Sequence, residues 1–322
     1  MSGKRVTIKE VAAEANVTAQ TVSRVLRNTG YVAADTYNKV IEAVKRLNYV
    51  PNRMAASLRV GKSKSIAVVF DSLRNFYFAI MVDYIQREVQ NRGYTLQTIF
   101  ANSHTITEDI YRDALSLGVS AVISFLEADP EVVKVVKSFD VPLLIFGRRT
   151  SYPEIDYVTT DDVQGGRLVA ERFIQRGCKT FLYASEAFGM TCMQDRHTGF
   201  AEVLAQHGYK SDVIDCAGGV KPAFTEYIQK HGAPSAVFCL SDMIAYEILN
   251  ILKRLNISDT LVIGYDDISS DMTMPVELTS VGIDKYQHVS YVVSKIIAKA
   301  ENLYHGRIAE KVSVRLHIGE TA

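Results

Sequence analysis

The 322-residue sequence predicts an all-α domain at its N-terminus and a larger α/β body whose parallel sheets form two similar lobes. Two observations predict this class. Apolar residues recur at helical spacing over the first fifty residues, and apolar strands then alternate with helices to the end of the chain. A third observation is the placement of charge. The whole chain is neutral, but residues 1–64 carry twelve basic and four acidic side chains, so a head of net charge +8 precedes a body of −8.

The N-terminal domain is predicted to contain three helices. The segment Thr7-Ile-Lys-Glu10 has the form of a capping box, in which the threonine hydroxyl accepts from the first turn and the glutamate reaches back. Thr18 caps a second helix, Ala19 to Arg27, after a tight turn. A third helix is expected from about Asp35 to Leu47, because its apolar residues follow the spacing i, i+1, i+4 and i+7. These helices predict a compact domain over residues 1–50.

Residues 51–64 are predicted to form a hinge helix and a linker. This stretch has a short helical core from Asn52 to Leu58, and it ends in small and basic residues around Gly61. The two-lobed body is expected to occupy residues 65–322. Its first lobe spans about residues 65–161 plus 286–315, and its second lobe spans about 162–285.

Strands and helices of the body are expected in two series, which imply parallel sheets flanked by helices. The first series has the strands Ser65–Phe70, Thr95–Phe100, Ala121–Phe125 and Pro142–Phe146 and the helices 77–92, 107–117 and 130–138. The second series has the strands Thr180–Ala184, Ser211–Asp215, Ala236–Cys239 and Thr260–Gly264 and the helices 164–176, 193–207, 221–231 and 242–255. A last helix is expected at 286–305.

Composition and motifs exclude several classes of protein. No apolar run approaches the roughly 18 residues of a membrane span, and the first residues are polar, so the chain is expected to be cytoplasmic. The four cysteines form no Cys-x-x-Cys pair, which favours buried thiols over a metal site or disulfides. No cofactor is expected. The chain also lacks the Gly-x-Ser-x-Gly, P-loop, Gly-x-Gly-x-x-Gly and His-Glu-x-x-His motifs, so an enzyme is not predicted.

The second predicted helix has the pattern of a helix that reads the major groove of DNA. Such a helix presents short or amide side chains and a cation to the base edges, while its other face packs on a partner helix. Gln20 and Arg24 lie one turn apart on one face, and Val22 and Val25 lie on the other. The alternative is an ordinary amphipathic helix with a solvated face. The +8 charge of the head favours DNA binding.

Long stretches of the sequence resemble the lactose-repressor/galactose-repressor (LacI/GalR) family of transcription regulators. The head carries Thr7-Ile-Lys-Glu-Val-Ala, Val17-Thr-Ala-Gln-Thr-Val-Ser-Arg-Val-Leu and Leu47-Asn-Tyr-Val-Pro-Asn-Arg-Met-Ala-Ala-Ser-Leu58. The resemblance continues through Asn75-Phe-Tyr-Phe78, Asp161-Asp-Val-Gln-Gly-Gly166, Arg196-His-Thr-Gly-Phe200, Ser241-Asp242 and Gly264-Tyr-Asp-Asp267. It implies a helix-turn-helix DNA-binding domain followed by a two-lobed core like that of periplasmic binding proteins.

The resemblance assigns DNA contacts to the head and the hinge. Base or phosphate contacts are expected from the second helix and its cap, with supporting contacts before and after it; these residues are Thr7, Thr18, Ala19, Gln20, Thr21, Ser23, Arg24, Arg27 and Tyr31. Leu58 is assigned a wedge that enters a minor-groove step and kinks the DNA, with Asn52 and Ala55 beside it. The alternative is that Leu58 packs on the body. So short a helix is expected to form only with DNA and a second hinge.

An effector site is expected between the lobes, where the strands end. Matching to the family gives Phe78, Phe125, Arg148, Arg196, Ser241, Asp242 and Asp266. Arg196 and Asp266 are a donor and an acceptor suited to vicinal hydroxyls, so a carbohydrate, free or phosphorylated, is the expected ligand. For each residue the alternative is a structural ion pair or a cap. Gly147 departs from the family, because the lactose repressor has an acidic side chain there; Phe125 and Met190 also depart.

We therefore expect a ligand-responsive repressor that binds a palindromic operator as a homodimer. Two other classes stay open from the sequence. A sugar-binding receptor would share the two lobes but would not need a basic helical head. An enzyme using Asp266 and Arg196 would turn over a substrate and lose activity on Asp266→Asn.

Overall fold

The computed structural model describes residues 6–27, 29–50, 63–186 and 189–322, without the side chain of Arg27. The chain divides into two compact units, Met1–Ser63 and Lys64–Ala322, called here the head and the body and described separately. The described part of the head is built from helices, and the body contains two six-stranded sheets with helices around them. The predicted fold class is confirmed.

The head consists of α1 (Ile8–Glu14), α2 (Ala19–Arg27) and α3 (Ala34–Arg46). The predicted capping box is present at α1, where Thr7 and Glu10 each satisfy a backbone N–H of the other. Asn16 makes the turn toward α2 with a left-handed backbone (φ 52°). The three helices enclose a small core of aliphatic side chains, Val11, Ala12, Ala15, Val22, Val25, Val40 and Ala43.

The first lobe of the body contains a sheet of strand order β13-β7-β6-β4-β1-β2, in which neighbouring strands pair in parallel. Its strands are β1 (Ser65–Phe70), β2 (Thr95–Phe100), β4 (Ala121–Ser124), β6 (Leu143–Phe146), β7 (Asp156–Thr160) and β13 (Ala309–Val312). Its helices are α5 (Phe76–Asn91), α6 (Glu108–Ser116), α7 (Pro130–Ser138) and α12 (Lys285–Ala300). A two-stranded ladder joins β3 (Thr105–Ile106) to β5 (Glu127–Ala128).

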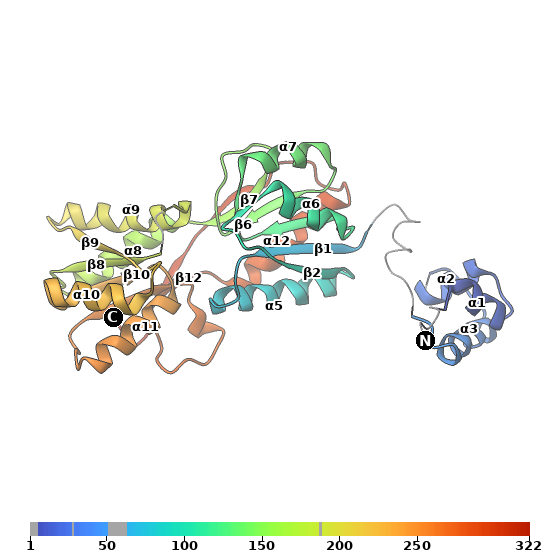
Figure 1. Ribbon diagram of the computed structural model, residues 1–322, viewed down its shortest axis with the longest axis horizontal. Helices are drawn as coiled ribbons and strands as arrows, with labels where there is room; N and C mark the ends of the chain where they lie inside the picture. Colours follow the sequence, from blue (N-terminus) through green and yellow to red (C-terminus); the bar gives the residue numbers. More distant parts are fainter. Residues whose placement is uncertain (1–5, 28, 51–62, 187–188) are drawn as a thin grey trace. The chain divides into compact units, whose positions relative to one another are not determined.

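Helices cover both faces of this sheet (Figure 1). Alternate residues of β1 show why, because Ile66 and Val68 pack with α5 and α12, whereas Ala67 and Val69 pack with α6 and α7. Both faces of β1 are therefore buried, as is usual for a parallel strand.

The second lobe repeats this plan with a sheet of order β14-β12-β11-β10-β8-β9. Its strands are β8 (Phe181–Ser185), β9 (Ser211–Asp215), β10 (Ala236–Cys239), β11 (Leu261–Tyr265), β12 (Ser280–Gly282) and β14 (Arg315–His317). Its helices are α8 (Asp162–Gln175), α9 (Thr191–Gln206), α10 (Val220–His231) and α11 (Asp242–Arg254), with a 3-10 turn, η1, at Ile268–Ser270. The pair β12 and β14 is antiparallel, whereas the other neighbours are parallel.

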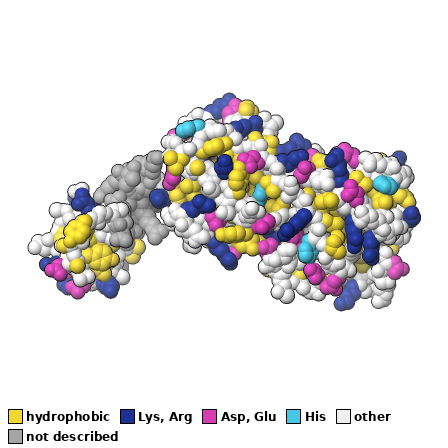
Figure 2. Space-filling view, turned by 180° about the vertical axis from the view of Figure 1, so that it is seen from behind, with side chains coloured by type: hydrophobic (Ala, Val, Ile, Leu, Met, Phe, Trp, Pro, Cys, Tyr) yellow, Lys and Arg dark blue, Asp and Glu magenta, His cyan; other side chains and the backbone are white. Residues whose placement is uncertain are grey.

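The chain passes between the two sheets three times. It enters the second lobe after β7, returns to the first lobe for α12 and β13, and crosses again so that β14 joins the second sheet (Figure 1). The sequence prediction assigned residues 286–315 to the first lobe; α12 and β13 do lie there, and β14 begins at Arg315 in the second. On the face of the body shown in Figure 2, basic and acidic side chains are interspersed.

Candidate functional site

Helix α2 of the head exposes the side chains that were predicted to read bases. Gln20 and Arg24 are exposed, whereas Val22 and Val25 on the opposite face are buried at 0% and 4% exposure. Ala19, Thr21 and Ser23 lie half-buried beside the exposed pair. The helix therefore presents an amide and a cation on a face that the head does not use for its own packing.

Two threonines that were predicted to contact DNA form caps in the head, Thr7 at the start of α1 and Thr18 at the start of α2. The Thr18 hydroxyl accepts from the Thr21 N–H at 3.1 Å and lies 2.9 Å from the Thr21 hydroxyl. The Thr7 N–H donates to Glu10 Oε2 at 2.6 Å. Tyr31 is 93% exposed, so the head core does not stabilise its ring.

The remaining DNA contacts fall outside the described residues. These are Asn52, Ala55 and Leu58 of the expected hinge, together with the side chain of Arg27. Their assignments stay predictions.

Three predicted residues of the first lobe gather where its strands end. Phe78, in the first turn of α5, packs edge-on against Phe125 at a centroid distance of 5.4 Å. Phe125 follows β4 and stacks on Phe146 at the end of β6. Arg148 follows two residues later and is 8% exposed, and its Nη1 atom is buried without a hydrogen-bond partner in the described chain.

Arg196 of α9 is the predicted residue of the second lobe with the most contacts. Its Nε donates to Asp162 at 2.9 Å, its Nη1 donates to the carbonyl of Leu240 at 2.6 Å, and its guanidinium lies 3.5 Å from the ring centre of Tyr265. The ion pair is buried, with side-chain exposures of 11% for Arg196 and 2% for Asp162. Burial raises the pKa of Asp162, and the charge of Arg196 opposes that rise. Arg196 is thus held in one orientation.

Close helix packing fixes the position of Arg196. A Cβ atom on Gly166 of α8 would lie 2.0 Å from the backbone oxygen of Arg196, and one on Gly199 of α9 would lie 1.9 Å from the backbone oxygen of Val163. Helices α8 and α9 can approach this closely only because these positions lack side chains.

Asp266 lies at the carboxyl end of β11 with an uncommon backbone. Its φ is 108°, and that of Asp267 is 50°, so two consecutive residues that are not glycine have positive φ. The Asp266 carboxylate accepts from Asn75 Nδ2, at the start of α5 in the other lobe, at 3.4 Å. Burial raises the pKa of Asp266 to about 6, and Arg196 opposes this rise. Tyr77 lies two residues after Asn75. Burial raises the pKa of its hydroxyl, and the nearby charge of Asp266 raises it further.

Ser241 and Asp242 use their side chains within the lobe. Ser241 caps α11 by accepting from the Ile244 N–H at 3.5 Å. Asp242 is fully buried, and it accepts from the Ile268 N–H at 2.8 Å and from the Ser280 hydroxyl at 2.6 Å. These contacts are the structural roles left open by the sequence, and effector contact by either residue stays a prediction.

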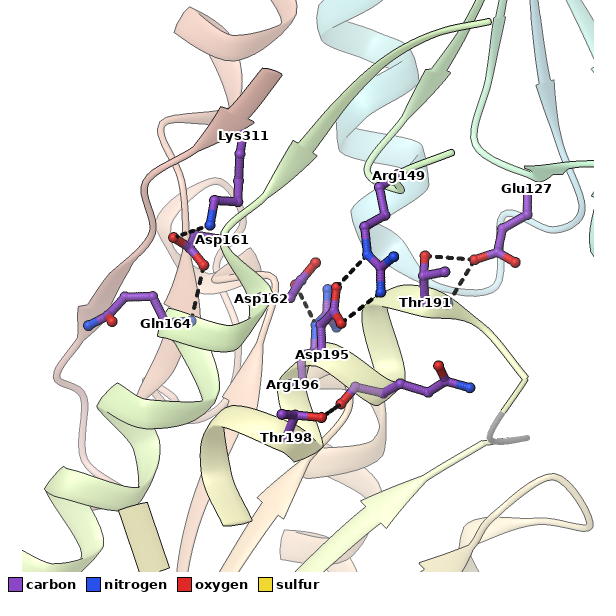
Figure 3. A network of polar contacts seen from close by, with 11 residues as sticks. Glu127, Arg149, Asp161, Asp162, Gln164, Thr191, Asp195, Arg196, Thr198 and Lys311 are labelled. Carbon is purple, nitrogen blue, oxygen red and sulfur yellow. Dashed lines mark hydrogen bonds and ion pairs between the residues drawn. The ribbon is translucent and has the colours of Figure 1, made fainter. Parts of the chain in front are cut away.

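Polar contacts between the lobes involve residues that sequence reasoning missed (Figure 3). Arg149 forms a two-point ion pair with Asp195, with N–O distances of 2.9 and 3.0 Å. Glu127 accepts from the N–H and the hydroxyl of Thr191, each at 2.8 Å, and so caps α9 from the other lobe. On α5, Tyr84 donates to Asp271 at 2.5 Å. Arg149 could have been suspected from its place beside Arg148, but its partner could not.

The described residues contain no group of three or more His, Cys, Asp or Glu side chains placed to hold a metal ion. In the same part of the chain, no helix is long and apolar enough to cross a membrane.

Comparison with known proteins matches residues 7–52 to "Bacterial regulatory proteins, lacI family" and residues 170–321 to "Periplasmic binding protein-like domain". The chain is 30% identical to catabolite control protein A of Staphylococcus aureus over 76% of each chain. It is 27% identical to the HTH-type transcriptional repressor PurR of Photobacterium profundum over 94% of each. The fold is similar to that of the lac repressor dimer bound to operator and the anti-inducer ONPF, with a TM-score of 0.83 and 22% identity over 99% of each chain.

Proposed function

Because this chain belongs to the lacI family of bacterial regulatory proteins, we propose that it is a DNA-binding transcriptional repressor whose operator affinity is controlled by a small molecule. The observation that carries the proposal is the surface of α2, where Gln20 and Arg24 are exposed one turn apart in an N-terminal segment, residues 1–64, of net charge +8. The charge attracts any duplex, and the amide and guanidinium supply the contacts that distinguish bases.

The repressor acts as a homodimer on a palindromic site. One small head reaches few bases, and a second head on the same duplex raises affinity and fixes the spacing of the half-sites. Support comes from the similar lac repressor structure, which is a dimer bound to operator. The hinge contacts of Asn52, Ala55 and Leu58 belong to this proposal.

The effector binds between the lobes and is a carbohydrate, free or phosphorylated. Arg196 of α9 offers a donor, Asp266 offers an acceptor at the carboxyl end of β11, and Phe78 with Phe125 offers an apolar wall in the first lobe. Hydroxyl groups on a carbon skeleton match this combination. Effector binding changes how the lobes meet, and this alters the population of dimers that fit the operator. A coupling of about 1–3 kcal/mol would change operator affinity by about 5- to 150-fold.

Operator selection followed by mutation tests the proposal. The full chain is used to enrich binding sites from a randomised duplex pool, and affinities for the enriched site are measured by fluorescence anisotropy. Gln20→Ala and Arg24→Ala are each expected to lose about 1–3 kcal/mol for that site. Lys39→Ala, at an exposed position of α3, is the control. It removes one positive charge and is expected to weaken binding to every duplex slightly and to the same extent.

The proposal fails if the pool yields no enriched sequence at low ionic strength, or if both α2 variants bind the enriched site as tightly as the wild-type chain. The proposed control by a small molecule is tested separately. It is excluded if sugars and sugar phosphates that stabilise the body leave operator affinity unchanged at every salt concentration.

A further inference from the structure

Arg148 differs from the other arginines near the junction of the lobes. Arg149 is paired with Asp195 and Arg196 is paired with Asp162. Arg148 is 8% exposed, forms no ion pair with a described residue, and has a buried Nη1 atom without a hydrogen-bond partner. A buried cation without a partner is strongly unfavourable, and such charges are normally paired.

The position of Arg148 connects it with the effector site. It lies two residues after Phe146, the last residue of β6, which stacks on Phe125. It also acts on Cys192, in the first turn of α9: burial raises the pKa of this thiol, and Arg196 and Arg148 both oppose the rise. The two guanidinium groups, one from each lobe, are therefore both near enough to Cys192 to act on its thiol.

The chain supplies no carboxylate at the position before Arg148. Gly147 has a left-handed backbone, with φ 82°, and a Cβ atom there would meet nothing within 4 Å. Glu127 of the same lobe forms no ion pair with Arg148, and its Oε1 atom accepts from the N–H and the hydroxyl of Thr191. Space and charge are thus both available for an acidic group from outside.

We propose that the effector carries a carboxylate or a phosphate that pairs with Arg148, while its hydroxyl groups face Arg196 and Asp266. The planar guanidinium fork matches both anions. The Asp266 carboxylate repels a second negative charge, so the acidic group is directed toward the first lobe. The effector class is then a sugar acid or a sugar phosphate rather than a neutral sugar. This inference rests on the proposed effector site.

Thermal unfolding of the full chain tests the pairing without knowledge of the natural effector. Sodium acetate and sodium phosphate are compared with sodium chloride at equal ionic strength. Each is expected to raise the unfolding temperature of the wild-type body by several degrees, and the larger shift identifies the preferred acid. Phosphate also stabilises proteins in general, so the measure is the difference between variants.

Arg148→Met should abolish the anion-dependent shift and, in chloride alone, unfold at a higher temperature than the wild-type chain, because an unpaired buried charge is replaced by an apolar side chain. Arg149→Met is the matched control and should keep the shift. Arg148→Lys should keep part of it. If Arg148→Met responds to acetate and phosphate as the wild-type chain does, or if the wild-type chain responds to neither, the inference is wrong.

Gly147→Asp provides an independent arm, because aspartate tolerates the left-handed backbone and places a counter-ion next to Arg148. It is expected to remove the acetate shift while leaving Arg148 in place. An unchanged shift would contradict the pairing. Operator affinity is measured on the same preparations. If the wild-type chain binds no operator, the proposed function is wrong. If it binds operator but acetate and phosphate do not stabilise it, only this inference is wrong.

Discussion

Gly166→Ala is expected to destabilise the body and to displace Arg196. Gly166 lies in α8, where a Cβ atom would come within 2.0 Å of the Arg196 backbone oxygen and 2.7 Å of the Phe200 backbone nitrogen. Both are atoms of α9, so no flexible side chain can move aside. Since ordinary contacts begin near 3.4 Å, the two helices must separate by about 1 Å at this point.

Two effects of opposite sign set the size of the change. Overpacking of a close contact costs about 1–3 kcal/mol. Replacing glycine by alanine within a helix returns up to about 1 kcal/mol, because alanine loses less conformational freedom. Because the Cβ atom would meet backbone at 2.0 Å, the cost is at the upper end of its range, so the net loss is about 2 kcal/mol. This corresponds to a fall in unfolding temperature of about 4–8 °C for a domain of this size.

Thermal and urea unfolding of the full chain, followed by circular dichroism, measures the loss. Gly218→Ala is the control, because a Cβ atom at Gly218 meets nothing within 4 Å and its φ is not positive. If Gly166→Ala is as stable as Gly218→Ala, the close approach of α8 and α9 does not limit this fold, and the reasoning is refuted.

Three further predictions concern the lobe contacts, a buried carboxyl and the head. Arg149→Met removes the ion pair with Asp195, in which the Arg149 side chain is 52% exposed and the Asp195 side chain 25%. The free energy of unfolding should change by less than about 1 kcal/mol, and the radius of gyration measured by X-ray scattering should increase. An unchanged radius of gyration would contradict a role of this pair in holding the lobes together. Burial raises the pKa of Asp266 to about 6, so the folded protein binds the carboxyl proton more tightly than the unfolded chain does. As the pH rises from 4 to 6, the free energy of unfolding of the wild-type chain should therefore fall by on the order of 2 kcal/mol relative to that of Asp266→Asn. If the two proteins show the same dependence of stability on pH, the pKa of Asp266 is not raised. Thr7→Ala removes the side-chain cap of α1 and should lower the stability of this helix by roughly 1 kcal/mol. It should weaken operator binding without changing the unfolding temperature of the body. If the amides of α1 exchange hydrogen equally fast in the variant and the wild-type chain, the cap does not stabilise the helix.

The sequence predicts those elements best whose form depends on local pattern and burial. The bounds of β2, β9, β10 and α7 agree with prediction to the residue, because apolar runs and caps mark their ends. The strands β12, β13 and β14 were not predicted. They are three or four residues long, and their pairing depends on where the chain returns after crossing between lobes, which no local pattern specifies.

The candidate site shows the same division. Arg196, Arg148 and Asp266 could be selected as candidates from the sequence because each follows a strand or lies in a recognisable motif, and their contact with an effector stays a prediction. The partners Asp162 and Asn75 were missed, since each meets its arginine or carboxyl only through packing between helices or lobes. Asp242 has a suitable side chain and position, but only the structure shows that Ile268 and Ser280 already occupy both of its oxygens.

The contacts between the lobes differ in strength from those within them. The buried ion pair of Arg196 and Asp162 lies entirely in the second lobe, so it does not resist a change in the angle between lobes. The polar contacts that join the lobes include Arg149 with Asp195, Glu127 with Thr191, Asn75 with Asp266 and Tyr84 with Asp271, together with the ion pair of Lys285, the first residue of α12, with Asp271. Partly exposed pairs and single hydrogen bonds are each worth about 1 kcal/mol or less, whereas the pair of Lys285 with Asp271 is buried, with Lys285 1% exposed. Complete reversal of a two-state equilibrium from 1:99 to 99:1 needs about 5.5 kcal/mol of differential binding. The proposed effector, with contacts to Arg148 of one lobe and Arg196 of the other, would shift this equilibrium only by the difference between its affinities for the two arrangements.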